Sequence, residues 1–197
     1  MTRFTSVLAA LALLTACGGE QQAPTASTLK VRPLATASRE EGNVGNLDRS
    51  VERDLARLRR LTAPFHRFAV AQAAGWSTQI TPCMTDPNGA GGMGFHYGNT
   101  AFIDGTAQVE RPQLLLYEPQ EDGRLELVGV EYIIPYTFHA RSAAPPELFG
   151  QKFKQVDAFQ LWGLHAWVWE KNRSGVFADW NPNVNCAHAT SLMVMVH

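Results

Sequence analysis

The sequence predicts an α+β domain in which an N-terminal kinked helix, or helix pair, packs on a curved antiparallel sheet. Apolar residues recur at helical spacing over residues 47–61. From Trp76 onward the apolar pattern becomes strand-like and is interrupted by turns rich in glycine and proline. Helices followed by a run of strands are the element order typical of α+β folds.

The chain begins with Arg3, an apolar run over residues 7–14, and small residues before Cys17. This run is too short to span a bilayer core, which takes about 20 apolar residues. It therefore predicts a targeting segment rather than a membrane helix.

The tetrapeptide Leu14-Thr15-Ala16-Cys17 resembles the lipobox of bacterial lipoproteins. The resemblance implies a signal peptide over residues 1–16 and a Cys17 whose thiol carries the lipid, palmitate-type acyl chains included. It also implies a protein anchored to the membrane of the cell envelope. Residue 18 is glycine rather than aspartate, and in the lipoprotein pattern this implies that the protein is sorted to the outer membrane or cell surface. The alternative is an ordinary signal peptide with an incidental thiol.

Residues 17–45 comprise this cysteine and a stretch rich in Gly, Gln, Ala, Pro, Ser and Thr. Such a composition buries too little apolar surface to order itself, so it predicts a flexible tether. The remaining residues, 46–197, are expected to form a single domain. With 45% hydrophobic residues and a net charge of −1, the chain is neither disordered throughout nor basic enough to favour nucleic acid as a partner.

The predicted helix has Leu47, Val51, Leu55, Leu58 and Leu61 on one face. Asn46 is the expected N-cap. Pro64 should kink or split the helix, with Thr62 capping a second piece that ends at Gly75.

The strands are expected after a glycine-rich loop over residues 81–94 and a short helical turn within 99–108. Residues 113–118 and 124–136 predict a hairpin that turns at 121–123. Residues 159–170, apolar on both faces, predict a central strand. A loop over 172–183 and a last strand over 185–196 complete the domain.

With Cys17 lipidated, the domain keeps two cysteines, Cys83 and Cys186. An exported protein meets an oxidising compartment, so the pair predicts a disulfide. The alternative is a soft metal site suited to copper, in which Cys186 and His188 join Met84 and Met93.

Three ionisable residues lie in strongly apolar strands: His96, Glu131 and His165. By strand alternation, each has a glycine two residues away on its own face: Gly98, Gly129 and Gly163. A missing side chain beside a polar one leaves room for water or a ligand. A buried carboxylate or imidazole also needs a partner, because desolvation is costly.

Three interpretations of these residues stay open. They could form an internal hydrogen-bond network that binds nothing. They could orient a small ligand in a pocket with aromatic walls, which we expect from Phe95, Trp162, Trp167 and Trp169. They could instead hold a divalent metal, or let Glu131 and His165 act in acid–base catalysis.

Other motifs carry less information. The glycine loop over residues 88–94 lacks the ending of a phosphate-binding loop. Asp179 and Asn181 could contact a ligand, although Asx-turns are the commoner use of such residues. His139, His188 and His197 are expected at the surface.

The runs GGMGFHYGN, LVGVEYIIP and LWGLHAWVWEKNRSGVFADWNPNV resemble motifs of an uncharacterised family of secreted bacterial domains. That resemblance brings no activity with it. The element order is similar to that of cystatin-like and NTF2-like folds, which often hold a pocket between helices and sheet. Fold alone does not determine function.

The sequence therefore predicts an envelope lipoprotein that binds a small ligand or a metal ion in an aromatic-lined pocket. The pocket residues are His96, Glu131, His165, Trp167 and Trp169. The two alternatives are an enzyme at the same pocket and a purely structural or interaction lipoprotein.

Overall fold

Two short helices separated by a 3₁₀ turn begin the described part of the chain. The computed structural model describes residues 48–189, so the predictions for the signal peptide, Cys17, the tether and Asn46 lie outside it. Helix α1 (Arg49–Thr62) is followed by η1 (Ala63–His66) and α2 (Phe68–Ala73). Asp48 is the N-cap of α1, and its carboxylate accepts a hydrogen bond from the backbone of Ser50.

The split of the helix at Pro64 is confirmed, but the predicted cap is wrong. The Thr62 hydroxyl donates to the carbonyl oxygen of Leu58 instead of capping η1. Leu61, expected on the buried face, is 43% exposed because the buried row of α1 runs through Leu55 and Leu58 to Thr62.

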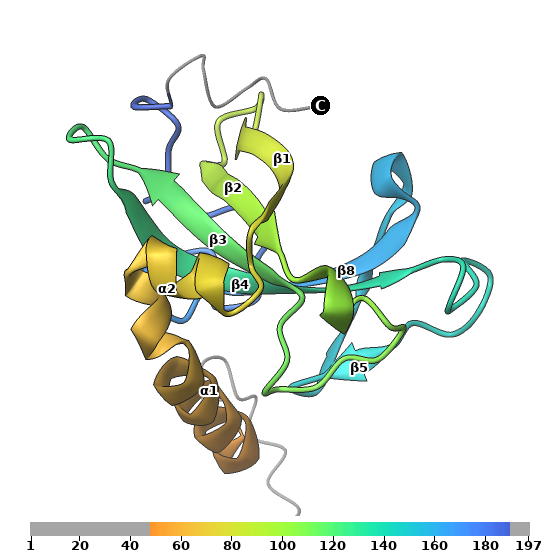
Figure 1. Ribbon diagram of the computed structural model, residues 1–197. Helices are drawn as coiled ribbons and strands as arrows, with labels where there is room; N and C mark the ends of the chain where they lie inside the picture. The colour runs from red at the N-terminus through yellow and green to blue at the C-terminus, as the bar shows by residue number, and fades with distance from the viewer. Residues whose placement is uncertain (1–47, 190–197) are drawn as a thin grey trace, which may run out of the picture. The chain divides into compact units, whose positions relative to one another are not determined.

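Six antiparallel strands form a strongly curled sheet, a half-barrel, and the predicted α+β class is confirmed (Figure 1). The strand order is β1-β2-β3-β4-β8-β7. Their bounds are β1 Thr78–Thr85, β2 Gly92–Gly98, β3 Leu114–Pro119, β4 Leu125–Pro135, β7 Lys154–Val156 and β8 Leu161–Ala166. Strands β5 (Glu147–Leu148) and β6 (Gln151–Lys152) form a separate small hairpin. Single 3₁₀ turns occur at η2 (Thr100–Phe102) and η3 (Asp157–Phe159).

The hairpin of β3 and β4 and the turn within 99–108 are confirmed, whereas other boundaries differ. Most of the segment 81–94, expected as a loop, belongs to β1 and β2. Its glycines permit close approach of another backbone: a Cβ at Gly92 would lie 2.7 Å from the carbonyl oxygen of Val184. Strand β8 ends at Ala166. Residues 185–189 form turns, not the start of a strand, and the rest of that prediction lies outside the described residues.

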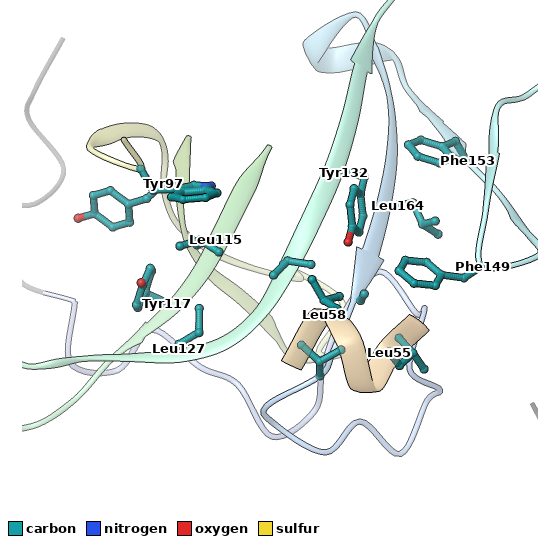
Figure 2. Packing of buried hydrophobic residues seen from close by; sticks show 14 of the residues in the cluster. Leu55, Leu58, Tyr97, Leu115, Tyr117, Leu127, Tyr132, Phe149, Phe153 and Leu164 are labelled. Atoms are coloured by element: carbon teal, nitrogen blue, oxygen red, sulfur yellow. The ribbon is translucent and has the colours of Figure 1, made fainter. Parts of the chain in front are cut away.

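The main core lies between the helices and one face of the sheet. Leu55 and Leu58 of α1 pack with aromatic and aliphatic side chains of the strands (Figure 2). The sheet residues on this face include Tyr97, Leu115, Tyr117, Tyr132 and Leu164. By alternation, their chain neighbours His96, Glu131 and His165 point to the opposite face.

The predicted disulfide between Cys83 and Cys186 is confirmed, with a Cα–Cα distance of 5.8 Å. It ties β1 to the segment that follows Val184. With both sulfurs bonded there is no free thiolate at this place, so the copper site that used Cys186 is wrong. Among the described residues, no helix has the length and apolarity needed to cross a bilayer.

Candidate metal centre and pocket

The three ionisable residues come together on the face of the sheet opposite the helices. Glu131 of β4 pairs directly with His165 of β8, and His96 comes from β2. Oε2 of Glu131 lies 3.4 Å from Nε2 of His96 and 3.9 Å from Nε2 of His165. One donor atom from each residue lies within 4.8 Å of the other two. This spacing is short enough for one metal ion to be bound by all three.

The cluster is buried. His96, Glu131 and His165 are 3%, 7% and 6% exposed. Nε2 of His165 is the one buried side-chain polar atom in the described residues that has no hydrogen-bond partner. Leaving such an atom unpaired is costly, so its presence needs an explanation.

Neighbouring side chains orient the two imidazoles. Thr81 of β1 pairs with His96 across the strands, and its Oγ1 lies 2.7 Å from Nδ1 of His96. The Trp167 ring stacks on His165 with 6° between the ring planes, and its Nε1 donates to the carbonyl oxygen of Ala178. In the tautomer in which Nδ1 of His96 donates to Thr81, the lone pair of Nε2 is directed at Glu131, which is the arrangement metal-bound histidines use.

Gly163 provides the space that Glu131 occupies. A Cβ at position 163 would lie 2.8 Å from Oε1 of Glu131. By strand alternation the sequence predicts Gly129 beside Glu131, with room for water or a ligand. Instead, Gly163 of the neighbouring strand leaves room for the Glu131 carboxyl group itself. Gly98 lies instead against Ile80, and Gly129 against the backbone of Ala166 and the Trp167 ring.

Burial controls the charge of the cluster. It raises the pKa of Glu131 to about 8, with a smaller contribution from the charge of Asp179. Burial lowers the pKa of His96 to about 3, assisted by His165, and that of His165 to about 3, assisted by Lys154. All three groups are therefore uncharged at neutral pH, and their short distances are not salt bridges.

The cluster lines a pocket of about 510 Å³, to which each of the six strands of the curled sheet contributes. This volume is in the range of small-molecule sites. The walls are mainly apolar and comprise Ile80, Met84, Met93, Leu114, Ile133, Val156, Ala158, Phe159, Leu161 and Trp180. Lys154 and Asp179, which also line the pocket, form an ion pair of 2.8 Å.

The aromatic walls expected from the sequence are not where they were predicted. Phe95 and Trp162 are buried in the core on the helix side, and Trp169 donates from Nε1 to Thr62 Oγ1 there. The alternation breaks after Ala166, which turns Trp169 away from His165. Trp167 supports His165 but does not line the pocket, and Trp180 is the tryptophan that does.

Sequence reasoning included Asp179, which lines the pocket, but missed Thr81 and Lys154. Neither has a local pattern that marks it, since each acquires its role by pairing across strands. Asn181 is fully buried, and its side chain accepts a hydrogen bond from the backbone of Asn183, which is the Asx-turn alternative. His139 contacts the carbonyl oxygen of Ala144, and His188 is exposed.

Two imidazoles and one carboxylate are a donor set that suits Zn²⁺ and other divalent transition metals, and three protein ligands leave a coordination position free. A comparison of the chain with known families, curated proteins and solved structures finds no match. Function is therefore inferred from the geometry of the cluster and its pocket.

Proposed function

We propose that this protein is an envelope lipoprotein whose domain binds one divalent transition metal ion, Zn²⁺ or a close equivalent, through His96, Glu131 and His165. The observation that carries the proposal is the unpaired, buried Nε2 of His165, which lies 3.9 Å from Glu131 beside a second imidazole. A bound metal would give this lone pair a partner. Both histidines are neutral at neutral pH, so each ring keeps one nitrogen without a proton that can bind a metal.

The lipid anchor at Cys17 and the location in the cell envelope belong to the same proposal and rest on the lipobox resemblance. An anchored domain with a metal at the base of a pocket is suited to capturing a ligand outside the cytoplasm. The second candidate function is acid–base catalysis by Glu131. A carboxyl group with a pKa of about 8, buried beside two neutral imidazoles, can exchange a proton near neutral pH.

Metal titration of the full-length protein tests the proposal. We expect wild type to bind one Zn²⁺, measured by calorimetry, and one Co²⁺, measured by visible absorption. Glu131→Gln should weaken metal binding by more than about 100-fold. This is more than the loss expected from removing a residue that only hydrogen-bonds to a metal ligand. Because glutamine resembles the protonated acid, this variant should keep the thermal stability of the metal-free protein.

Glu126→Gln is the matched control, since Glu126 is exposed on the same strand. It should bind both ions as wild type does. Absence of saturable binding to wild type, or equal affinities in wild type and Glu131→Gln, would contradict the metal site. If the metal site is contradicted in this way, proton-transfer activity of the metal-free wild type would favour the acid–base candidate.

A further inference from the structure

The pocket beside the cluster restricts what a bound metal can take as its next ligand. His96, Glu131 and His165 supply three donors from the sheet, and all three side chains also line the pocket. In a tetrahedral site the fourth position is free. Because the surrounding sheet is packed, a ligand reaches this position from the pocket. This inference rests on the proposed metal site.

The walls favour an apolar body for that ligand. They are formed by aliphatic, methionine and aromatic side chains from every strand of the sheet. Two wall residues from opposite edges of the sheet, Ile80 of β1 and Phe159 beside β7, are 41% and 50% exposed. Large apolar side chains that face a pocket and remain open to water gain free energy when an apolar molecule covers them.

The charges facing the pocket favour an anionic head. Lys154 and Asp179 neutralise each other in their 2.8 Å ion pair. The two imidazoles are neutral, and Glu131 must bind a metal as its carboxylate. A divalent ion therefore leaves the site with one net positive charge. In a pocket of low dielectric constant, an uncompensated charge is costly, and one monoanion removes it.

We propose that the metal-loaded pocket binds a small monocarboxylate with an apolar body, its carboxylate on the metal ion and its body against the apolar walls. Straight-chain and aromatic acids share this chemistry, so both classes belong in the test. A cation of the same size would face the positive site, and an alcohol would leave its charge uncompensated.

Cobalt-loaded full-length protein provides the test, with octanoate, phenylacetate, 1-octanol, octylamine and acetate as probes. We expect octanoate or phenylacetate to change the visible cobalt spectrum saturably, at least about tenfold more tightly than acetate, which lacks the apolar body. 1-Octanol and octylamine should leave the spectrum unchanged. The metal-free protein should bind octanoate more weakly than the cobalt-loaded protein.

Phe159→Ser should weaken octanoate binding by about three- to tenfold, because part of the apolar wall is lost. Phe138→Ser is the matched control, since Phe138 is 58% exposed and does not line the pocket. Cobalt affinity is measured in both variants. If cobalt binds but no carboxylate alters its spectrum, the ligand class is wrong and the metal site stands. If cobalt does not bind, both proposals fail.

Discussion

Glu131, His96 and His165 carry an unusual combination of protonation states for residues so close together. Desolvation raises the pKa of the acid and lowers the pKa of both bases, so none of them is charged at neutral pH. Metal binding would reverse this for Glu131, which must lose its proton to become a ligand.

The pH dependence of stability follows from these shifts for the metal-free protein. In the unfolded chain Glu131 titrates near 4.5 and the two histidines near 6.5. Between pH 4.5 and 6.5 the unfolded state binds two histidine protons and the folded state one glutamate proton, so stability rises with pH. Between pH 6.5 and 8 only the glutamate proton of the folded state remains, so stability falls, by up to about 1.4 kcal/mol per pH unit.

Urea unfolding at a series of pH values measures this optimum near pH 6.5. Glu131→Gln should remove the decline between pH 6.5 and 8. It should also steepen the rise between pH 4.5 and 6.5, because the folded state no longer binds a proton that offsets one of the two histidine protons of the unfolded state. Parallel profiles for wild type and the variant over that interval would show that Glu131 does not keep a proton in the folded state.

Thr81 is a positioning residue for His96. Thr81→Val keeps the shape but removes the hydroxyl 2.7 Å from Nδ1 of His96. We expect Zn²⁺ affinity to fall by about 10- to 100-fold, because the ring loses the contact that fixes its tautomer and orientation. Calorimetry measures the affinity, and Thr81→Ser should restore it. Thr85→Val, at an exposed position of β1, should have no effect, and an unchanged affinity in Thr81→Val would rule out this role.

The three cluster residues could be predicted from the sequence because each interrupts an apolar strand. Their partners could not. Thr81 reaches His96, and Gly163 makes room for Glu131, only through the pairing of β1 with β2 and of β4 with β8. Register between strands distant in the sequence is not written in any local pattern.

At the scale of elements, the predicted direction of side chains is wrong where a strand ends earlier than expected. The alternation in β8 places Trp162 and His165 on opposite faces correctly, but extending it past Ala166 puts Trp169 on the wrong side. Trp169 N and Glu170 N both approach the carbonyl oxygen of Val128, which shows that the regular ladder has ended there. The tryptophans of this segment, Trp162, Trp167 and Trp169, therefore pack in the core or against His165, and none of them lines the pocket.

Strand β8 contributes to the site through His165 and through Gly163, whose lack of a side chain leaves room for Glu131. Gly163→Ala places a Cβ 2.8 Å from Oε1 of Glu131, the mobile end of a flexible side chain. The carboxyl group should move while the fold persists, so we expect Zn²⁺ affinity to fall by about tenfold with little change in melting temperature. Gly98→Ala meets the side chain of Ile80 at 2.9 Å and is the control, expected to keep its affinity. Equal affinities in both variants would remove Gly163 from the account.

At the scale of the molecule, the sequence was sufficient for the fold class and the disulfide. Periodicity distinguishes helix from strand, and an even pair of cysteines in an exported domain favours a bridge. A loop of 103 residues closed by that bridge would add up to about 4–5 kcal/mol of stability in the chain-entropy treatment. The curl of the sheet was predicted only in outline, and a cystatin-like or NTF2-like architecture stays a prediction.

The curl gives the molecule its pocket. Both edge strands, β1 and β7, line the same pocket as the central strands, which a flat sheet would not allow. The helices fill the other face, so the cluster is supported by a complete core behind it. The structure thus combines a rigid base with an open side, which is the arrangement a binding site needs.

The most direct measurement is anomalous diffraction at the zinc absorption edge from crystals of the full-length protein grown with one equivalent of Zn²⁺. The account predicts a single strong peak bonded to Nε2 of His96, Nε2 of His165 and a carboxylate oxygen of Glu131, at distances of about 2.0–2.2 Å. A crystal in which these three side chains bind no zinc, while the ion lies elsewhere or is absent, would contradict the metal centre.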